Sequence, residues 1–192
     1  MGTLTYGDAP SAAFSSILIA GVADLGFRPP TPGEIEPARE LAGRMMGCKV
    51  APARVVASML AIQPASTLVR RDGGEVSAVA AVLLLNAAGG RALLANEFDG
   101  LSPQRRFLVR GRERATHCYY WGIAGATKSA SAAVMEVFRR VRFELFPELT
   151  PAALAATPIG RHVAMTRLDM HPARDAQDNL MIGAPLLAAR AA

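Results

Sequence analysis

Cysteine and histidine are scarce in this chain. Among 192 residues there are 2 cysteines and 3 histidines. Cys48 and Cys118 are too few for a disulfide framework, and neither they nor the scattered histidines have the paired spacing of a structural zinc site. We therefore expect no metal site, and a reducing, cytoplasmic compartment.

A long apolar run and a basic N-terminus are also missing. The apolar stretch at residues 9–27 has no basic start and is interrupted by Ser15, Ser16 and Asp24. It is too short and too polar to span a bilayer, and a weak signal peptide is the less favoured alternative. We predict that residues 1–25 form an extension that packs on the domain or on a partner chain, which favours a homodimer.

Acidic residues are fewer than basic ones, 16 against 21, so the net charge is +5. The basic charge gathers in one cluster, formed by Arg105, Arg106, Arg110, Arg112 and Arg114. Such a patch could meet nucleic acid or a phosphorylated cofactor, or it could be a solvated face. Aromatic residues do not interleave with these arginines, so a nucleic-acid-binding regulator is the less favoured alternative.

The composition that remains, 51% apolar and 19% charged, is that of a globular domain, which we place at residues 26–192. Helical patterns cover 31–47, 52–66, 129–145 and 158–168, and short strands are predicted at 26–30 and 153–158. Three apolar runs separated by glycine turns predict a meander of strands at 68–70, 76–85 and 92–97, followed by a strand at 117–123. We expect residues 180–189 to form a last pair of strands or to dock loosely on the domain. The pattern predicts an α+β (mixed α/β) fold, a mostly antiparallel twisted sheet with helices on both faces.

The most informative segment is HCYYWGIAGATKSASAAVMEVFRRVRFELF, residues 117–146. It predicts a strand, a loop of small residues and a long amphipathic helix. Small residues let backbone N–H groups approach an anion, and the helix dipole favours negative charge at that end. This segment is therefore a candidate phosphate-binding site.

In this element order, residues 26–170 resemble the GNAT superfamily of acyl-CoA N-acyltransferases. In that family a loop of pattern Gln/Arg-x-x-Gly-x-Gly/Ala holds the pyrophosphate of coenzyme A. Here Ala126, Ser129 and Ser131 stand at the three pattern positions, so the chain departs at each. Serine is still small enough for close backbone approach, and its hydroxyl can donate to phosphate.

Residues 156–172 resemble the late helix of the same family. Gly160 matches its pattern, but Met165 stands near the position of a tyrosine that many members use as general acid, and Asp169-Met170 replaces Gly-Phe. The part of the domain after residue 170 is predicted to be shortened.

The resemblance implies a divergent GNAT member that acetylates a primary amine by direct attack on the thioester, with acetyl-CoA or another acyl-CoA as cosubstrate and no metal. A catalytically silent CoA-binding or protein-interaction module is the alternative, so whether the chain is an enzyme stays open. The resemblance also implies that the strand backbone pairs with pantetheine and that an arginine of the cluster meets the 3′-phosphate. The implied cofactor-binding residues are Trp121, Gly122, Ile123, Gly125, Ala126, Thr127, Lys128, Ser129, Ala130 and Ser131.

Candidate catalytic groups follow from the predicted strands. Glu97, with Asp99 beside it, is the candidate base at the end of the strand expected at 92–97. Of Tyr119 and Tyr120, one should face the cleft and the other the core, and Tyr120 is the candidate proton donor. His117 could titrate near neutral pH, and Cys118 is expected to be a core residue.

Overall fold

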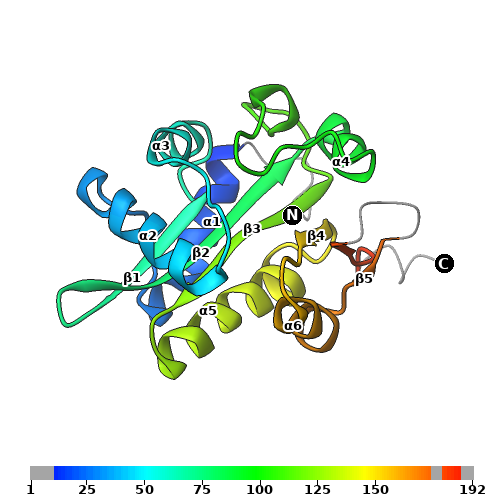
Figure 1. Cartoon of the computed structure of the whole chain (residues 1–192). Coiled ribbons are helices and arrows are strands. Elements are labelled where there is room, and N and C mark those ends of the chain that lie inside the picture. Colours follow the sequence, from blue (N-terminus) through cyan, green and yellow to red (C-terminus); the bar gives the residue numbers. More distant parts are fainter. Residues whose placement is uncertain (1–10, 174–178, 187–192) are drawn as a thin grey trace.

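One sheet organises the chain in the computed structural model, which describes residues 11–173 and 179–186 (Figure 1). Among these residues, six strands pair in the order β1–β2–β3–β4–β6–β5. All neighbours are antiparallel except β3 and β4, which are parallel. This confirms the predicted mixed α/β class with a mostly antiparallel sheet. The strands are β1 (Thr67–Asp72), β2 (Glu75–Leu85), β3 (His117–Gly125), β4 (Thr150–Leu154), β5 (His171–Pro172) and β6 (Leu180–Ile182).

Helices cover both faces of this sheet. On one face, the core joins side chains of α1 (Ser11–Val22), α5 (Lys128–Arg140) and α6 (Pro158–Leu168). The other face carries α2 (Ile35–Met46), α3 (Ala53–Ile62) and α4 (Ala87–Leu94). Strand β2 lies between the layers: Val82 and Leu84 point to the first face, and Leu83 and Leu85 point to the second. Its continuous apolar run is therefore buried on both sides, as predicted.

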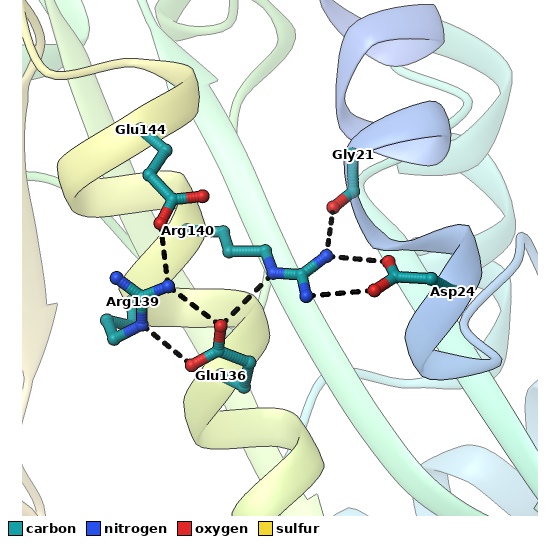
Figure 2. A network of polar contacts seen from close by, with 6 residues as sticks. All are labelled: Gly21, Asp24, Glu136, Arg139, Arg140 and Glu144. Atoms are coloured by element: carbon teal, nitrogen blue, oxygen red, sulfur yellow. Dashed lines mark hydrogen bonds and ion pairs between the residues drawn. The ribbon is translucent and has the colours of Figure 1, made fainter.

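Helix α1 packs against α5 of its own chain. Phe14, Leu18 and Val22 are buried in the core of the first face. Figure 2 shows the polar side of this contact, where the Arg140 guanidinium donates to both Asp24 carboxylate oxygens at 2.6 and 2.9 Å. Arg140 also donates to the Gly21 carbonyl at 2.9 Å. The N-terminal segment therefore contributes to the main core; the boundary at residue 25 stays a prediction.

The strand predicted at 92–97 is wrong, because residues 87–94 form helix α4. The Asn86 side chain caps this helix by accepting from the Gly89 amide at 2.9 Å. Gly89 and Gly90 indicated a turn in the sequence, but the structure uses them for close packing. A Cβ at Gly89 would overlap the Phe107 carbonyl, and one at Gly90 would overlap the His117 ring.

The other helices and strands differ less from their predicted boundaries. The short strand predicted at 153–158 is displaced to β4 (Thr150–Leu154), because Thr157 caps α6 and ends the extended segment. At 26–30 only Arg28 makes a bridge, to Val69. The helix predicted at 129–145 is α5 followed by a π-helical turn at Val141–Leu145. In the 180–189 segment β6 forms, while residues 187–189 lie outside the described residues.

Candidate functional site

Strands β3 and β4 part from each other after a short parallel contact. Their pairing runs from His117 with Thr150 to Tyr120 with Ala153. At the same point the register of β3 on β2 shifts, since Ala81 pairs with Gly122 but Val82 pairs with Tyr120. Trp121 is thus the extra residue of a β-bulge, a feature common beside active sites. Beyond it, β3 is paired on its β2 side, and its other edge is open among the described residues.

A cavity of about 690 Å³ lies at this opening. Its lining includes Trp121–Gly125 on the open strand, Ala153 and Leu154 on β4, and Met135 and Phe138 on α5. A second part, which we call the α2 lobe, is lined by Met45, Met46, residues 48–51, Val56 and residues 98–101. The cavity therefore takes residues from both faces of the sheet, and β3 runs between them.

The loop between β3 and α5 is fixed by its own hydrogen bonds. The Ala126 amide donates to the Ser77 carbonyl at 2.8 Å, and the Thr127 hydroxyl caps α5 by accepting from the Ala130 amide at 3.1 Å. A Cβ at Gly125 would overlap the backbone of Ser131, so this position needs glycine. The loop is therefore a preformed entry into the helix.

The first turn of α5 leaves amides for an external acceptor. The Ser131 amide donates to Thr127 at 2.8 Å, and its hydroxyl donates to the Gly125 carbonyl at 3.2 Å. Lys128 and Ser129 occupy the first two positions of the helix, where an α-helix supplies no backbone acceptor. Their N–H groups and the Lys128 ammonium can therefore face an anion.

The ten predicted cofactor-binding residues fall into two groups around the cavity. Trp121, Gly122, Ile123, Gly125 and Ser131 line it. The others lie on the adjoining loop and first turn, where Ala126, Thr127, Lys128 and Ser129 are exposed and Ala130 is buried. They thus lie along one continuous strand-loop-helix segment that borders the cavity.

The two tyrosines of β3 point to opposite faces. Tyr120 packs on Phe138 of α5 at a ring distance of 4.8 Å, and Tyr119 packs edge-on against Phe98 at 5.2 Å. Both border the cavity. The Tyr120 hydroxyl is buried and has no hydrogen-bond partner among the described residues. Burial raises the pKa of Tyr120 well above its usual value, against the opposing effect of the Arg142 charge.

Trp121 fixes the loop that carries Asp99. Its indole N–H donates to the Gly100 carbonyl at 2.6 Å, and one Asp99 oxygen accepts from the Leu101 amide at 2.8 Å. Asp99 lines the cavity. Glu97 is exposed and is not among the described lining residues, because it follows the end of α4 and not the end of a strand.

The remaining polar candidates lie away from the cavity. His117 packs on Gly90, with its Nδ1 atom 2.9 Å from the Thr116 hydroxyl, and burial lowers its pKa. Cys118 is buried, and burial raises the pKa of its thiol, in agreement with a core role.

Within the described residues, no three His, Cys, Asp or Glu side chains gather as metal ligands would. In the same ranges, no helix combines the length and apolar character that crossing a membrane requires.

The arginine cluster stands at the other end of β3 from the phosphate-binding candidate. Residues 105–114 precede His117, where β3 begins, whereas α5 starts after its end at Gly125. Nine strand residues separate them, a span of roughly 30 Å. Figure 1 shows α4 near one end of β3 and the start of α5 near the other. The predicted contact between this cluster and a 3′-phosphate beside α5 therefore has no support in the geometry.

The α2 lobe was missed by the sequence analysis. Its walls come from the end of α2, the segment before α3 and the segment after α4, and none of these carries a recognisable motif. Of the residues that line this lobe, the sequence analysis had singled out Asp99 as a candidate base and Cys48 only as one of the two cysteines. The side-chain contact of Trp121 with Gly100 joins residues 21 positions apart, which no sequence periodicity reports.

Comparisons with known proteins identified a similar fold but no protein of similar sequence. No family model matches the chain, and no curated protein matches it. Among solved structures, the chain is similar to the GNAT-like decarboxylase GphF in complex with isobutyryl-CoA, with a TM-score of 0.50 and 11% identity. The match covers 82% of this chain and 98% of that chain. The protein therefore has a GNAT-like fold with a divergent sequence, which confirms the predicted resemblance at the level of the fold.

Proposed function

We propose that the protein binds a CoA thioester at the opening between β3 and β4 and transfers the acyl group to a primary amine. The observation that carries this proposal is the continuity of the open edge of β3, the cavity beside it and the start of α5. The GNAT-like decarboxylase supports the first half, because it holds isobutyryl-CoA on a similar fold. Acetyl-CoA is one candidate cosubstrate among acyl-CoAs.

The pyrophosphate would lie at the start of α5. The free amides of Lys128 and Ser129 would donate to its oxygens, and the helix dipole and the Lys128 ammonium would favour its charge. Gly125 and Ala126 keep bulky side chains away from this surface. The serine that replaces glycine at 129 is exposed and leaves the backbone accessible.

The pantetheine arm would pair with the open edge of β3. Its two amides can exchange hydrogen bonds with the backbone of Trp121, Gly122 and Ile123, as an added strand does. This interaction depends on backbone atoms, so it tolerates the sequence divergence of the chain. The thioester would then lie near the bulge at Trp121.

The transfer needs one group to take a proton and another to supply one. The amine nitrogen attacks the thioester carbonyl carbon, a C–N bond forms, the C–S bond breaks, and the departing thiolate is protonated. Tyr120 is our proposed proton donor, because the residue borders the cavity, its buried hydroxyl has no hydrogen-bond partner among the described residues, and burial keeps it protonated at neutral pH. Asp99 is the proposed acceptor of the amine proton. Glu97 could act only through solvent, given its place outside the lining.

Thermal unfolding with and without acyl-CoA tests the binding step. A ligand at 100 times its dissociation constant stabilises a fold by about 2.7 kcal/mol, so a clear rise in melting temperature is expected. No shift with millimolar acetyl-CoA or isobutyryl-CoA would refute the proposal. A shift without thiol release across an amine panel would favour the silent CoA-binding module over the transferase.

The variant Ser129→Glu tests where the phosphate lies. A carboxylate in the first turn of α5 should repel the pyrophosphate and abolish the shift caused by CoA. Ala132→Glu is the matched control, because Ala132 is exposed on the same helix and does not line the cavity. Unchanged CoA affinity in Ser129→Glu would show that the pyrophosphate does not bind at the start of α5.

A further inference from the structure

The walls of the α2 lobe are apolar. They comprise the thioether side chains of Met45 and Met46, the aliphatic side chains of Val50 and Val56, and the ring of Phe98. Thioethers on unbranched side chains adapt to apolar ligands of varied shape. A ligand bound here gains affinity by burying its hydrocarbon surface.

The cavity also has an apolar rim. Six large apolar side chains are exposed among the described residues, and four of them line this cavity: Met45, Leu101, Ile123 and Ile159. Apolar side chains that gather in the exposed wall of a cavity mark a binding site more reliably than scattered ones. Met45 and Leu101 belong to the α2 lobe, where they are 52% and 40% exposed.

The charges in the lining do not suit a polycation. Asp99 is the one carboxylate among the described lining residues, and Arg39 and Lys49 supply positive charge. Arg39 is paired with Glu36, whereas Lys49 has no ion pair among the described residues. A single ammonium group can pair with Asp99, but further ammonium groups would approach Lys49 without a second carboxylate to offset the repulsion.

We infer that the acceptor is a small amine with one positive charge and an apolar body, bound in the α2 lobe with its nitrogen toward Asp99. This inference rests on the proposed function and specifies the substrate class of that site. Phenethylamine and isopentylamine represent the class. Spermidine and kanamycin represent the polycationic acceptors that the lining disfavours.

Cys48 offers a direct measure of occupancy in the α2 lobe. It is exposed and lines the lobe, whereas Cys118, the other cysteine of the chain, is buried. Alkylation by iodoacetamide, followed by mass spectrometry with and without CoA, should therefore report on Cys48. We expect phenethylamine at ten times its dissociation constant to slow alkylation about tenfold. Spermidine at equal ionic strength should have no effect, and Cys48→Ser should take up no label.

Leu101→Asp tests the charge argument. A second carboxylate at the rim should weaken protection by phenethylamine and introduce protection by spermidine. Leu94→Asp is the matched control, because Leu94 is 42% exposed but lies outside the described lining. The control should behave as the unmodified protein does.

The outcomes separate this inference from the proposed function. Equal or better protection by spermidine in the unmodified protein would overturn it. Protection by long-chain acyl-CoA and by no amine would also overturn it, because the lobe would then hold the acyl chain. Protection by phenethylamine without any thermal shift from CoA would support an amine-binding site in the α2 lobe. It would refute only the proposed CoA-dependent transfer.

Discussion

Glu148 is a carboxylate in an unfavourable place. Both of its oxygens are buried, and burial raises the pKa of the group above its usual value. A raised pKa means that the folded protein binds this proton more tightly than the unfolded chain does. The stabilisation linked to Glu148 is therefore full below the ordinary glutamate pKa and is lost as the pH rises through the raised value.

We predict that Glu148→Gln makes the protein more stable at pH 7, because the amide removes a buried charge and keeps the shape. Urea unfolding should give a higher midpoint for the variant at pH 7, and the difference should shrink toward pH 4. Glu75→Gln, at an exposed position, is the control. A variant less stable at pH 7 would show that the Glu148 charge is compensated in a way that burial alone does not reveal.

Single residues also show where sequence reasoning fails. In AAGGRALL the adjacent glycines indicate a turn, yet they allow α4 to approach Phe107 and His117. A turn and a close contact both require glycine, and only the contacting residue, 18 or more positions away in the sequence, distinguishes the two cases. The strand predicted there was wrong, and with it the reason for placing Glu97 at a strand end.

At the scale of elements, the α1–α5 contact depends on charge as well as packing. Glu136 accepts hydrogen bonds from Arg139 and Arg140, and these two bring the pKa of its carboxyl down to about 2 (Figure 2). Arg140 in turn holds Asp24 beside α1, and this pairing lowers the pKa of Asp24. Glu136 and Asp24 are thus stronger acids in the folded protein than in the unfolded chain.

A lowered pKa gives stability that is present above the unfolded value and lost as the pH falls through the folded one. We therefore predict that the contribution of Glu136 is complete above pH 5 and disappears between about pH 5 and 2. Glu136→Gln should lower the melting temperature at pH 7 and flatten its fall over that range, with exposed Glu75→Gln as the control. Parallel pH profiles for Glu136→Gln and the unmodified protein would contradict this.

Elements with a strong local signal were predicted well. The β3 strand and α6 lie where their patterns placed them, since aromatic alternation and a Thr-Pro helix start are local features. β4 was displaced because TPAAL has a proline and short side chains, and its strand conformation comes from pairing with β3 and β6.

At the scale of the whole molecule, the N-terminal helix is part of the main core. Leu18 is fully buried in the cluster that also holds Val134, Val137 and Phe138 of α5. We predict that Leu18→Ala destabilises the protein by about 2 to 5 kcal/mol, the usual cost of such a cavity, measured by urea unfolding. Leu94→Ala, at an exposed position, should cost far less. Equal and small effects would mean that the packing of α1 contributes little to the stability of the domain.

The cavity could be predicted only in part. The strand-loop-helix at 117–140 is contiguous, so the sequence alone could predict its secondary structure and mark it as a candidate phosphate-binding segment. The α2 lobe combines segments near residues 45–56 and 98–101 with β3, and only the folded sheet brings them together. The placement of the arginine cluster failed for the same reason, because the direction of β3 decides which end of the strand it occupies.

The strand order also has a consequence for how the chain is made. β6 lies between β4 and β5, so β5 has no strand partner among the described residues until β6 is present. Domains generally fold as units during synthesis, and a unit cannot be complete before its last segment has been made. One half of this sheet, which includes the β4 side of the cavity, can therefore be completed only after residue 182 has been synthesised.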